Sequence, residues 1–166
     1  MEFDWKRIGD IQVGRENLGD DMPVAVYRLL QYNMMDELVS RFDQKQAEDV
    51  LCGAGFRAGL AFEKNIMEKQ EDFQSFVAEL QKKLKEFKIG ILRIEKADLE
   101  NLNFVLTVSE DLDCSGLPVM GDTVCVYDEG FIAGVLKGYT GKDFIVSEID
   151  CWATGDRTCR FTAEGK

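Results

Sequence analysis

Histidine is absent from the 166 residues of this chain. Its absence removes the commonest general base of enzymes, the Ser-His and Cys-His nucleophile pairs, and histidine as a ligand of catalytic metals. An enzyme built on this sequence would have to use carboxylates, tyrosines, a thiolate or a borrowed cofactor. The composition therefore argues against an enzyme more than for one.

Long apolar segments are also missing. No run approaches the roughly 18 consecutive apolar residues that are needed to span a bilayer. The N-terminal segment MEFDWKRIGD is charged and lacks the apolar stretch of a signal peptide. We therefore expect a cytoplasmic protein without membrane insertion.

Positive charge is scarce, because 20 lysines and arginines face 31 aspartates and glutamates and leave a net charge of −11. A protein that binds nucleic acid directly should present a basic stripe that neutralises phosphates. The one basic cluster, residues 82–88, falls at the end of an expected helix, where cations interact favourably with the helix dipole. A direct nucleic-acid partner is therefore not expected.

The remaining composition is that of one globular domain, with 45% hydrophobic residues and only 2 prolines. Apolar residues recur at helical spacing in four segments, at about 23–38, 44–69, 72–87 and 120–138. Segments rich in β-branched and aromatic residues predict strands at 89–96, 103–109, 143–150 and 157–163. We expect an α+β fold in which an antiparallel four-stranded sheet, made of two hairpins, packs against about four helices. Residues 1–166 would form a single domain with an irregular lead-in (1–20), a helical half (21–88) and a sheet-bearing half (89–166).

Glycines are spaced four residues apart in the last predicted helix, at Gly130, Gly134 and Gly138. Each costs roughly 1 kcal/mol relative to alanine in a helix, so this ridge indicates very close packing against the sheet or another helix. The second helix carries small residues around Gly55 and Gly59. These either let another backbone approach or form a wall around a ligand.

Three of the five cysteines lie in the last third of the chain. If the two last strands pair across the turn at 152–157, Cys151 and Cys159 become neighbours, and Cys159 faces the helix that contains Cys125. Glu148 precedes Cys151 by three residues, so strict alternation places it on the opposite face unless the strand bends or bulges. Zinc binds thiolates and carboxylates in a tetrahedron. Buried thiols that bind nothing, or a disulfide between the last two cysteines, are alternatives, although the expected compartment argues against the disulfide.

The segment CVYDEGFIAGVLKGYTGKDFIVSEIDCWATGDRTCRF, residues 125–161, resembles the 4-vinyl-reductase domain family. In that family a glycine-rich helix bearing a cysteine precedes a strand ending in E-x-x-C and a strand with the pattern G-D-x-x-C-x-F. The upstream GRENLG at 14–19 and the Tyr27–Arg28 helix are similar to the N-terminal half of the family. Relatives include sensor domains of bacterial activators that respond to aromatic compounds and, more distantly, subunits of the TRAPP vesicle-tethering complex.

The resemblance implies a zinc ion held by three cysteines and one glutamate. The matching positions are Cys125, Glu148, Cys151 and Cys159, separated by 22, 2 and 7 residues. Four protein ligands close the tetrahedron, which is typical of structural zinc. Cys114, in the loop at 111–118, is a candidate reactive thiol, an occasional metal ligand or neither.

The resemblance also implies a domain that encloses a hydrophobic or aromatic small molecule and forms a homodimer. We expect a binding module that acts as a sensor or carrier. The alternatives are an enzyme or accessory factor in tetrapyrrole vinyl reduction, and a structural adaptor like the tethering-complex subunits. Candidate pocket residues are the aromatic side chains nearest the metal-bearing half: Phe104, Tyr127, Phe131 and Trp152.

Overall fold

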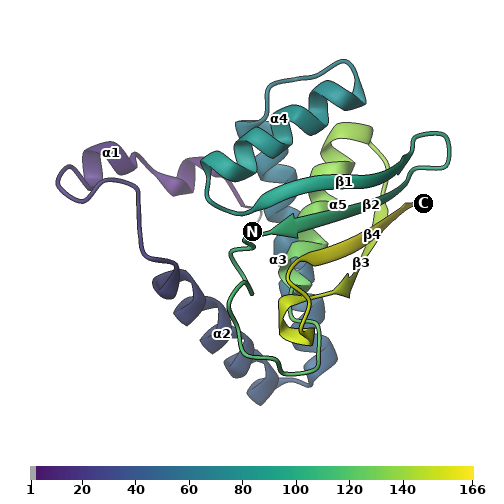
Figure 1. Ribbon diagram of the computed structural model, residues 1–166. Coiled ribbons are helices and arrows are strands. Elements are labelled where there is room, and N and C mark those ends of the chain that lie inside the picture. Colours follow the sequence, from purple (N-terminus) through teal and green to yellow (C-terminus); the bar gives the residue numbers. More distant parts are fainter. Residues whose placement is uncertain (1–2) are drawn as a thin grey trace. The chain divides into compact units, whose positions relative to one another are not determined.

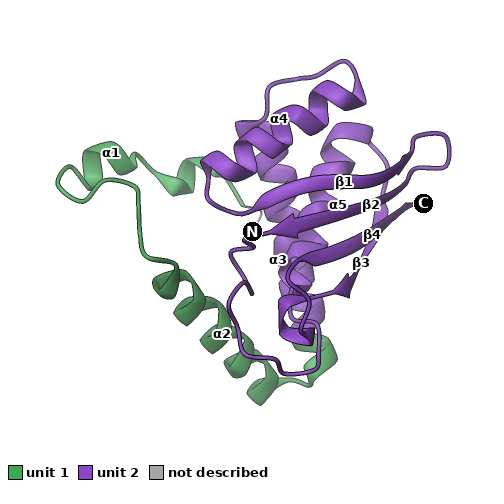
Figure 2. Cartoon of the chain, viewed as in Figure 1, with its two compact units in different colours: residues 1–47 green, residues 48–166 purple. Residues whose placement is uncertain are grey.

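The computed structural model describes residues 3–166, and the chain divides into two compact units, residues 1–47 and residues 48–166 (Figure 2). In the first unit, the lead-in contains two single-turn helices, η1 (Trp5–Ile8) and α1 (Ile11–Gly14), which are followed by the long helix α2 (Val24–Arg41). Each short helix starts at an aspartate whose carboxylate accepts a backbone N–H of the first turn. The single-domain division stays a prediction.

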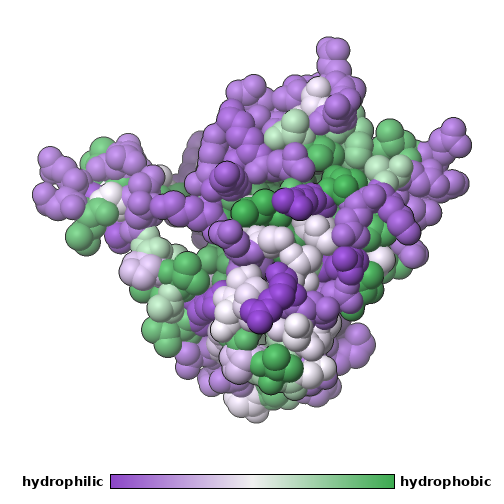
Figure 3. All heavy atoms as spheres, in the orientation of Figure 1, coloured by the Kyte–Doolittle hydropathy of each residue, from purple (hydrophilic) through white to green (hydrophobic). Residues whose placement is uncertain are grey.

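Helix α2 carries exposed apolar side chains along its length. Figure 3 shows apolar groups that reach the surface along this helix. The most exposed of them are Leu29 and Leu30, at 65% and 63% of their full area. Separately, no helix in the described part of the chain is both long and apolar enough to cross a bilayer.

The second unit is α+β, as the sequence predicts (Figure 1). Its elements are α3 (Gln44–Ile66, which starts just before the unit boundary), α4 (Phe73–Glu86), β1 (Ile91–Asp98), β2 (Asn103–Ser109), α5 (Val126–Thr140), β3 (Phe144–Asp150), η2 (Trp152–Thr154) and β4 (Cys159–Gly165). The four strands form one antiparallel sheet in the order β1-β2-β4-β3. Both predicted hairpins, β1–β2 and β3–β4, are confirmed. The central pairing of β2 with β4 joins them, with Leu106 opposite Phe161.

Helix α5 begins at Val126, six residues later than the sequence predicts, so Cys125 is its N-cap and does not lie inside the helix. The preceding segment cannot be helical because Gly121 has a φ of +95°. In addition, the backbone N–H groups of Met120 and Gly121 both donate to the carbonyl of Ala153, at 2.8 and 3.1 Å. These bonds tie the segment to the turn between β3 and β4.

Glycines bring α3 and α5 into backbone contact. A Cβ at Gly130 would lie 1.9 Å from the carbonyl oxygen of Cys52, and a Cβ at Gly134 would lie 2.2 Å from that of Phe56. The contact is reciprocal, because a Cβ at Gly55 would lie 2.0 Å from the carbonyl oxygen of Tyr127. The small residues of α3 therefore serve close helix packing, which was one of the two interpretations that the sequence left open.

Helix α4 presents one apolar face to the core. Asp72 accepts the backbone N–H of Ser75 at 2.9 Å and caps the helix. Phe76, Leu80 and Leu84 then recur every four residues and are all buried. This spacing places them on a single stripe, as the sequence predicts.

Candidate metal centre and apolar cavity

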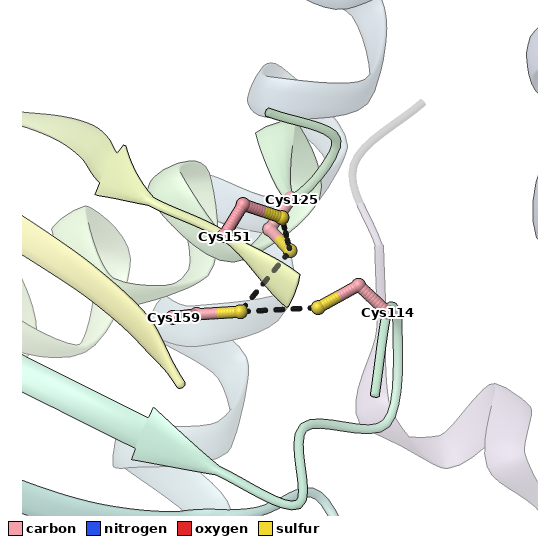
Figure 4. Close-up of side chains that lie close together, drawn as sticks. All are labelled: Cys114, Cys125, Cys151 and Cys159. Atoms are coloured by element: carbon pink, nitrogen blue, oxygen red, sulfur yellow. Dashed lines mark hydrogen bonds between the residues drawn. The ribbon is translucent and has the colours of Figure 1, made fainter. Parts of the chain in front are cut away.

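Four cysteine side chains from four separate segments converge in one buried cluster (Figure 4). Cys114 lies in the loop after β2, Cys125 caps α5, Cys151 follows β3, and Cys159 is the first residue of β4. All four are at most 1% exposed, and their Sγ atoms lie within 4.8 Å of one another. The cluster could hold a metal ion.

The register of the last hairpin explains how two of these cysteines meet. Asp150 lies opposite Arg160 in the β3–β4 pair, so the next residue on β3 and the preceding residue on β4 face each other. Alternation along β4 buries Cys159, Phe161 and Ala163 on one face. The pairing across the turn and the inward orientation of Cys159 are both confirmed.

The separations within the cluster suit a tetrahedral thiolate site. Zinc–sulfur bonds of about 2.3 Å in a tetrahedron place sulfur atoms about 3.8 Å apart. The Sγ of Cys125 is 3.9 Å from that of Cys151 and 3.8 Å from that of Cys159. The Sγ atoms of Cys114 and Cys159 are closer, at 3.0 Å. The cysteines of the described chain are free thiols, so the alternative of a Cys151–Cys159 disulfide does not occur.

The electrostatics of the cluster favour a cation. Neighbouring thiols donate to the Cys151 sulfur and lower the pKa of that thiol, whereas the same interactions, together with burial, raise the pKa of Cys125. Several thiolates so close together repel one another unless a positive charge lies between them. A bound metal ion would supply that charge and deprotonate all the ligands. The residues present therefore fit a metal ion, whose identity the geometry leaves open.

Glu148 lies beside this cluster. A break in the β3–β4 register between Glu148 and Asp150 provides the bulge that the sequence analysis required. Its Oε2 accepts the backbone N–H of Cys125 at 3.0 Å, while its Oε1 is buried without a hydrogen-bond partner. Burial is the main cause that raises the pKa of Glu148 to about 8. Because its carboxylate already binds the N-terminus of α5, its role as a metal ligand stays a prediction.

Cys114 is the residue whose position the sequence described least well. Asp111 fixes it, because Asp111 Oδ1 accepts the backbone N–H groups of Asp113 and Cys114 at 2.8 and 3.1 Å. An aspartate followed three residues later by a cysteine is the local pattern of such a turn. That signal indicates a turn at this position but does not indicate which other elements the turn faces.

A second feature of this unit is an apolar cavity of about 50 Å³. It is enclosed by α4, β1, β2 and α5, together with Ile89 and Asp111 next to the strands. Most of its wall consists of leucine, isoleucine, valine and phenylalanine side chains. Two of the predicted pocket residues, Phe104 and Phe131, line it.

The other two predicted pocket residues lie outside the lining of this cavity. The indole N–H of Trp152 donates to the carbonyl of Leu117 at 3.0 Å, and the guanidinium of Arg157 lies 5.1 Å from the centre of its ring. Tyr127 is half-buried, and burial is the main cause that raises its pKa to about 12. Sequence reasoning did not single out the α4 residues Phe73, Phe76 and Val77, which contribute to the wall.

Comparison with known proteins supports the same half of the chain. Residues 104–164 match the family model of the 4-vinyl-reductase domain. Two uncharacterized proteins of Methanocaldococcus jannaschii are similar over most of their length. One is 27% identical over 146 residues, which cover 88% of this chain and 80% of that protein, and the other is 26% identical over 165 residues, which cover 93% and 94%.

Solved structures share the fold at low sequence identity. A vinyl-4-reductase family protein from Methanocaldococcus jannaschii aligns with a TM-score of 0.68 and 20% identity, covering 100% of this chain and 99% of that one. The phenol-responsive sensory domain of the transcription activator PoxR, solved with phenol, aligns with a TM-score of 0.65 and 16% identity, covering 87% and 75%.

A third structure extends this set. It is a trafficking protein particle complex subunit 3 from Naegleria fowleri, covalently bound to palmitic acid, with a TM-score of 0.66, 11% identity and coverage of 86% and 95%. The family match and the shared fold confirm the resemblance that the cysteine pattern carries. Residues 104–164 of this chain thus belong to the 4-vinyl-reductase domain family.

Proposed function

We propose that this chain is a binding module for a hydrophobic or aromatic small molecule and acts as a sensor or carrier. The observation that carries this proposal is the cavity between α4, the sheet and α5, whose wall is almost entirely apolar. Ligand pockets are typically concave and mainly apolar, with few polar groups that orient the ligand. The chemistry of this wall therefore favours a ligand that is itself largely apolar.

The relatives add support of a general kind. The PoxR sensory domain was solved with phenol, and the trafficking-complex subunit is covalently bound to palmitic acid. Both molecules are mainly apolar, and both proteins have the fold of this chain. A binding role is accordingly a better proposal for this fold than a role in packing alone.

The cavity must enlarge to take an aromatic ring. At about 50 Å³ it is smaller than the roughly 150 Å³ of an engineered protein cavity that binds benzene. The α4 side of the wall includes Phe73 and Val77, which are only partly buried. We infer that the ligand enters on this side by displacing α4 side chains, because fewer contacts are lost there than in the sheet.

We further propose that the cysteine cluster binds one structural zinc ion. Three of its thiolates, Cys125, Cys151 and Cys159, belong to the ligand set that the sequence implies, and Cys114 completes a tetrahedron by proximity. Zinc would neutralise the thiolates and connect the loop at 111–118 to the N-terminus of α5 and to the last hairpin. A site with four protein ligands leaves no position for substrate, which favours a structural role.

The choice between Cys114 and Glu148 as fourth ligand has a direct test. We expect Cys114→Ser to lower zinc affinity by at least about tenfold, because it removes one of the four clustered thiolates. Glu148→Gln should lower it less, because the amide oxygen can still accept the N–H of Cys125. Zinc competition with a chromophoric chelator measures both affinities. A larger loss in Glu148→Gln than in Cys114→Ser would instead favour the ligand set with the glutamate.

A homodimer and a cytoplasmic location complete the proposal. The exposed leucines of α2 supply apolar area that a second copy could cover. Free thiols are typical of a reducing compartment. A native mass spectrum of the untagged protein, purified without chelator, reads subunit number, zinc content and any retained small molecule together. A zinc-loaded dimer without any retained organic molecule would shift weight towards the adaptor alternative.

The cavity itself is tested by filling it. We expect Val77→Trp to abolish binding of toluene, because the indole would occupy the space between α4 and the sheet. Ala78→Trp is the matched control, because it adds the same ring at the next, exposed position of α4 and should leave binding unchanged. Isothermal titration calorimetry with toluene measures both. Failure of the wild-type protein to bind toluene or any other apolar aromatic would contradict the proposed function.

A further inference from the structure

Among the described residues, only two polar ones line the cavity, and both are aspartates. Asp111 lies at the loop that follows β2, and Asp128 lies in the first turn of α5. Every other residue of the lining is apolar. The cavity therefore has a polar end, made of two carboxyl groups, at the side where the sheet meets the N-terminus of α5.

The two carboxyl groups differ in how they are satisfied. Asp111 is 3% exposed, and its Oδ1 accepts two backbone N–H groups of its own turn. The Oδ2 of Asp128 is fully buried and has no hydrogen-bond partner. A buried polar atom without a partner costs about 1–3 kcal/mol, so an unsatisfied acceptor at the wall of a cavity points to a ligand that supplies the missing donor.

In the part of the chain that the structure describes, no basic side chain lines the cavity to balance these carboxyl groups. Burial raises the pKa of Asp128 well above its usual range, and the neighbouring Asp111 raises it further. The helix dipole at the N-terminus of α5 offsets only part of this cost. An anionic ligand would meet two acceptors of like charge there, whereas a hydroxyl or ammonium group would meet the groups it needs.

We infer that Asp111 and Asp128 select, among apolar molecules, those that carry a hydrogen-bond donor, namely a hydroxyl or an ammonium group, and exclude carboxylates. This inference rests on the proposed function, because it assigns the orientation and class of the ligand in the same cavity. The apolar part of the ligand would lie against α4 and the sheet. Its donor group would lie against the Oδ2 of Asp128.

Four probes of similar shape test this selection: toluene, phenol, benzylamine and benzoate. We expect phenol and benzylamine to bind roughly tenfold or more tightly than toluene, the effect of about one net hydrogen bond to a buried carboxyl group. Benzoate should bind more weakly than toluene. Calorimetry on the full-length, metal-loaded protein gives all four dissociation constants.

Substitutions assign the effect to the carboxyl group. Asp128→Leu should abolish the preference for phenol over toluene while toluene still binds. Asp128→Asn keeps the shape and an acceptor oxygen, so it should retain the phenol preference and lose the benzylamine preference. Zinc content and thermal unfolding of each variant report whether the fold is intact, and the asparagine variant carries the test if the leucine variant does not fold.

The outcomes separate the two proposals. Equal affinity for toluene and phenol, tight binding of benzoate, or an unchanged phenol preference in Asp128→Leu would each overturn the assignment of the carboxyl groups while leaving the cavity as a binding site. Absence of binding by all four probes would overturn the binding function and this inference with it.

Discussion

Replacing Cys159 by serine is expected to release the bound zinc and to unfold much of residues 48–166. Cys159 is fully buried between β2 and β3, and its Sγ lies 3.0 and 3.8 Å from the sulfur atoms of Cys114 and Cys125. Structural zinc contributes on the order of 10 kcal/mol of folding free energy in zinc-finger peptides. We therefore expect the variant to lose about 5 kcal/mol or more of unfolding free energy, which is comparable to the total stability of many domains.

The measurement combines metal analysis with thermal unfolding of protein purified without chelator. Cys52→Ser is the matched control, because Cys52 is a half-buried cysteine of α3 outside the cluster. It should keep one zinc ion per chain and change the unfolding temperature little. A wild-type chain that is fully folded without metal would contradict the zinc proposal and leave the four cysteines as core thiols.

Gly134→Ala is expected to produce the second large effect, a loss of about 3 kcal/mol or more in unfolding free energy. The added methyl group would lie 2.2 Å from the carbonyl oxygen of Phe56 and 2.9 Å from the backbone nitrogen of Leu60. Backbone atoms cannot rotate aside as a flexible side chain can, so α3 and α5 would have to separate and open the core between them. For a chain of this length we expect the melting temperature to fall by roughly 6–12 °C.

The control for this substitution lies on the opposing helix. Gly53 is also a helix-interior glycine, but the nearest atom to a methyl group added there would be a guanidinium nitrogen of Arg57 at 3.9 Å. Gly53→Ala should therefore stabilise the protein by about 0.5–1 kcal/mol through helix propensity alone. Differential scanning calorimetry of both variants compares the two effects. Equal and small changes at both positions would contradict the close backbone contact between the helices.

Much of the local structure follows from patterns of neighbouring residues. The alternation of Phe104, Leu106 and Val108 predicts β2, and the apolar face at 72–87 predicts α4; both elements are present. The same local logic brings Cys151 and Cys159 together, because a hairpin fixes its own register. The bulge at Glu148 was also deduced from the alternation, although whether this carboxylate binds metal stays a prediction.

Other features depended on contacts between segments that are far apart in sequence. The start of α5 was predicted too early because the apolar pattern extends before it, whereas hydrogen bonds to Ala153 and the left-handed Gly121 keep residues 120 and 121 out of the helix. The glycine ridge predicted a close partner but left the sheet and another helix as equal alternatives. Only the packed structure identifies that partner as α3.

The sequence by itself thus determined the α+β class, the two hairpins, the family and three of the clustered cysteines, because each depends on spacing along the chain. Tertiary structure alone decided that Cys114 joins the cluster and that the apolar cavity ends in Asp111 and Asp128. Those groups come from a loop, a helix start and strand ends, and their separation in space is set by the pairing of β2 with β4 and by the contact of α5 with the sheet. Periodicity describes which way a side chain faces on its own element, but it carries no information about which other element it meets.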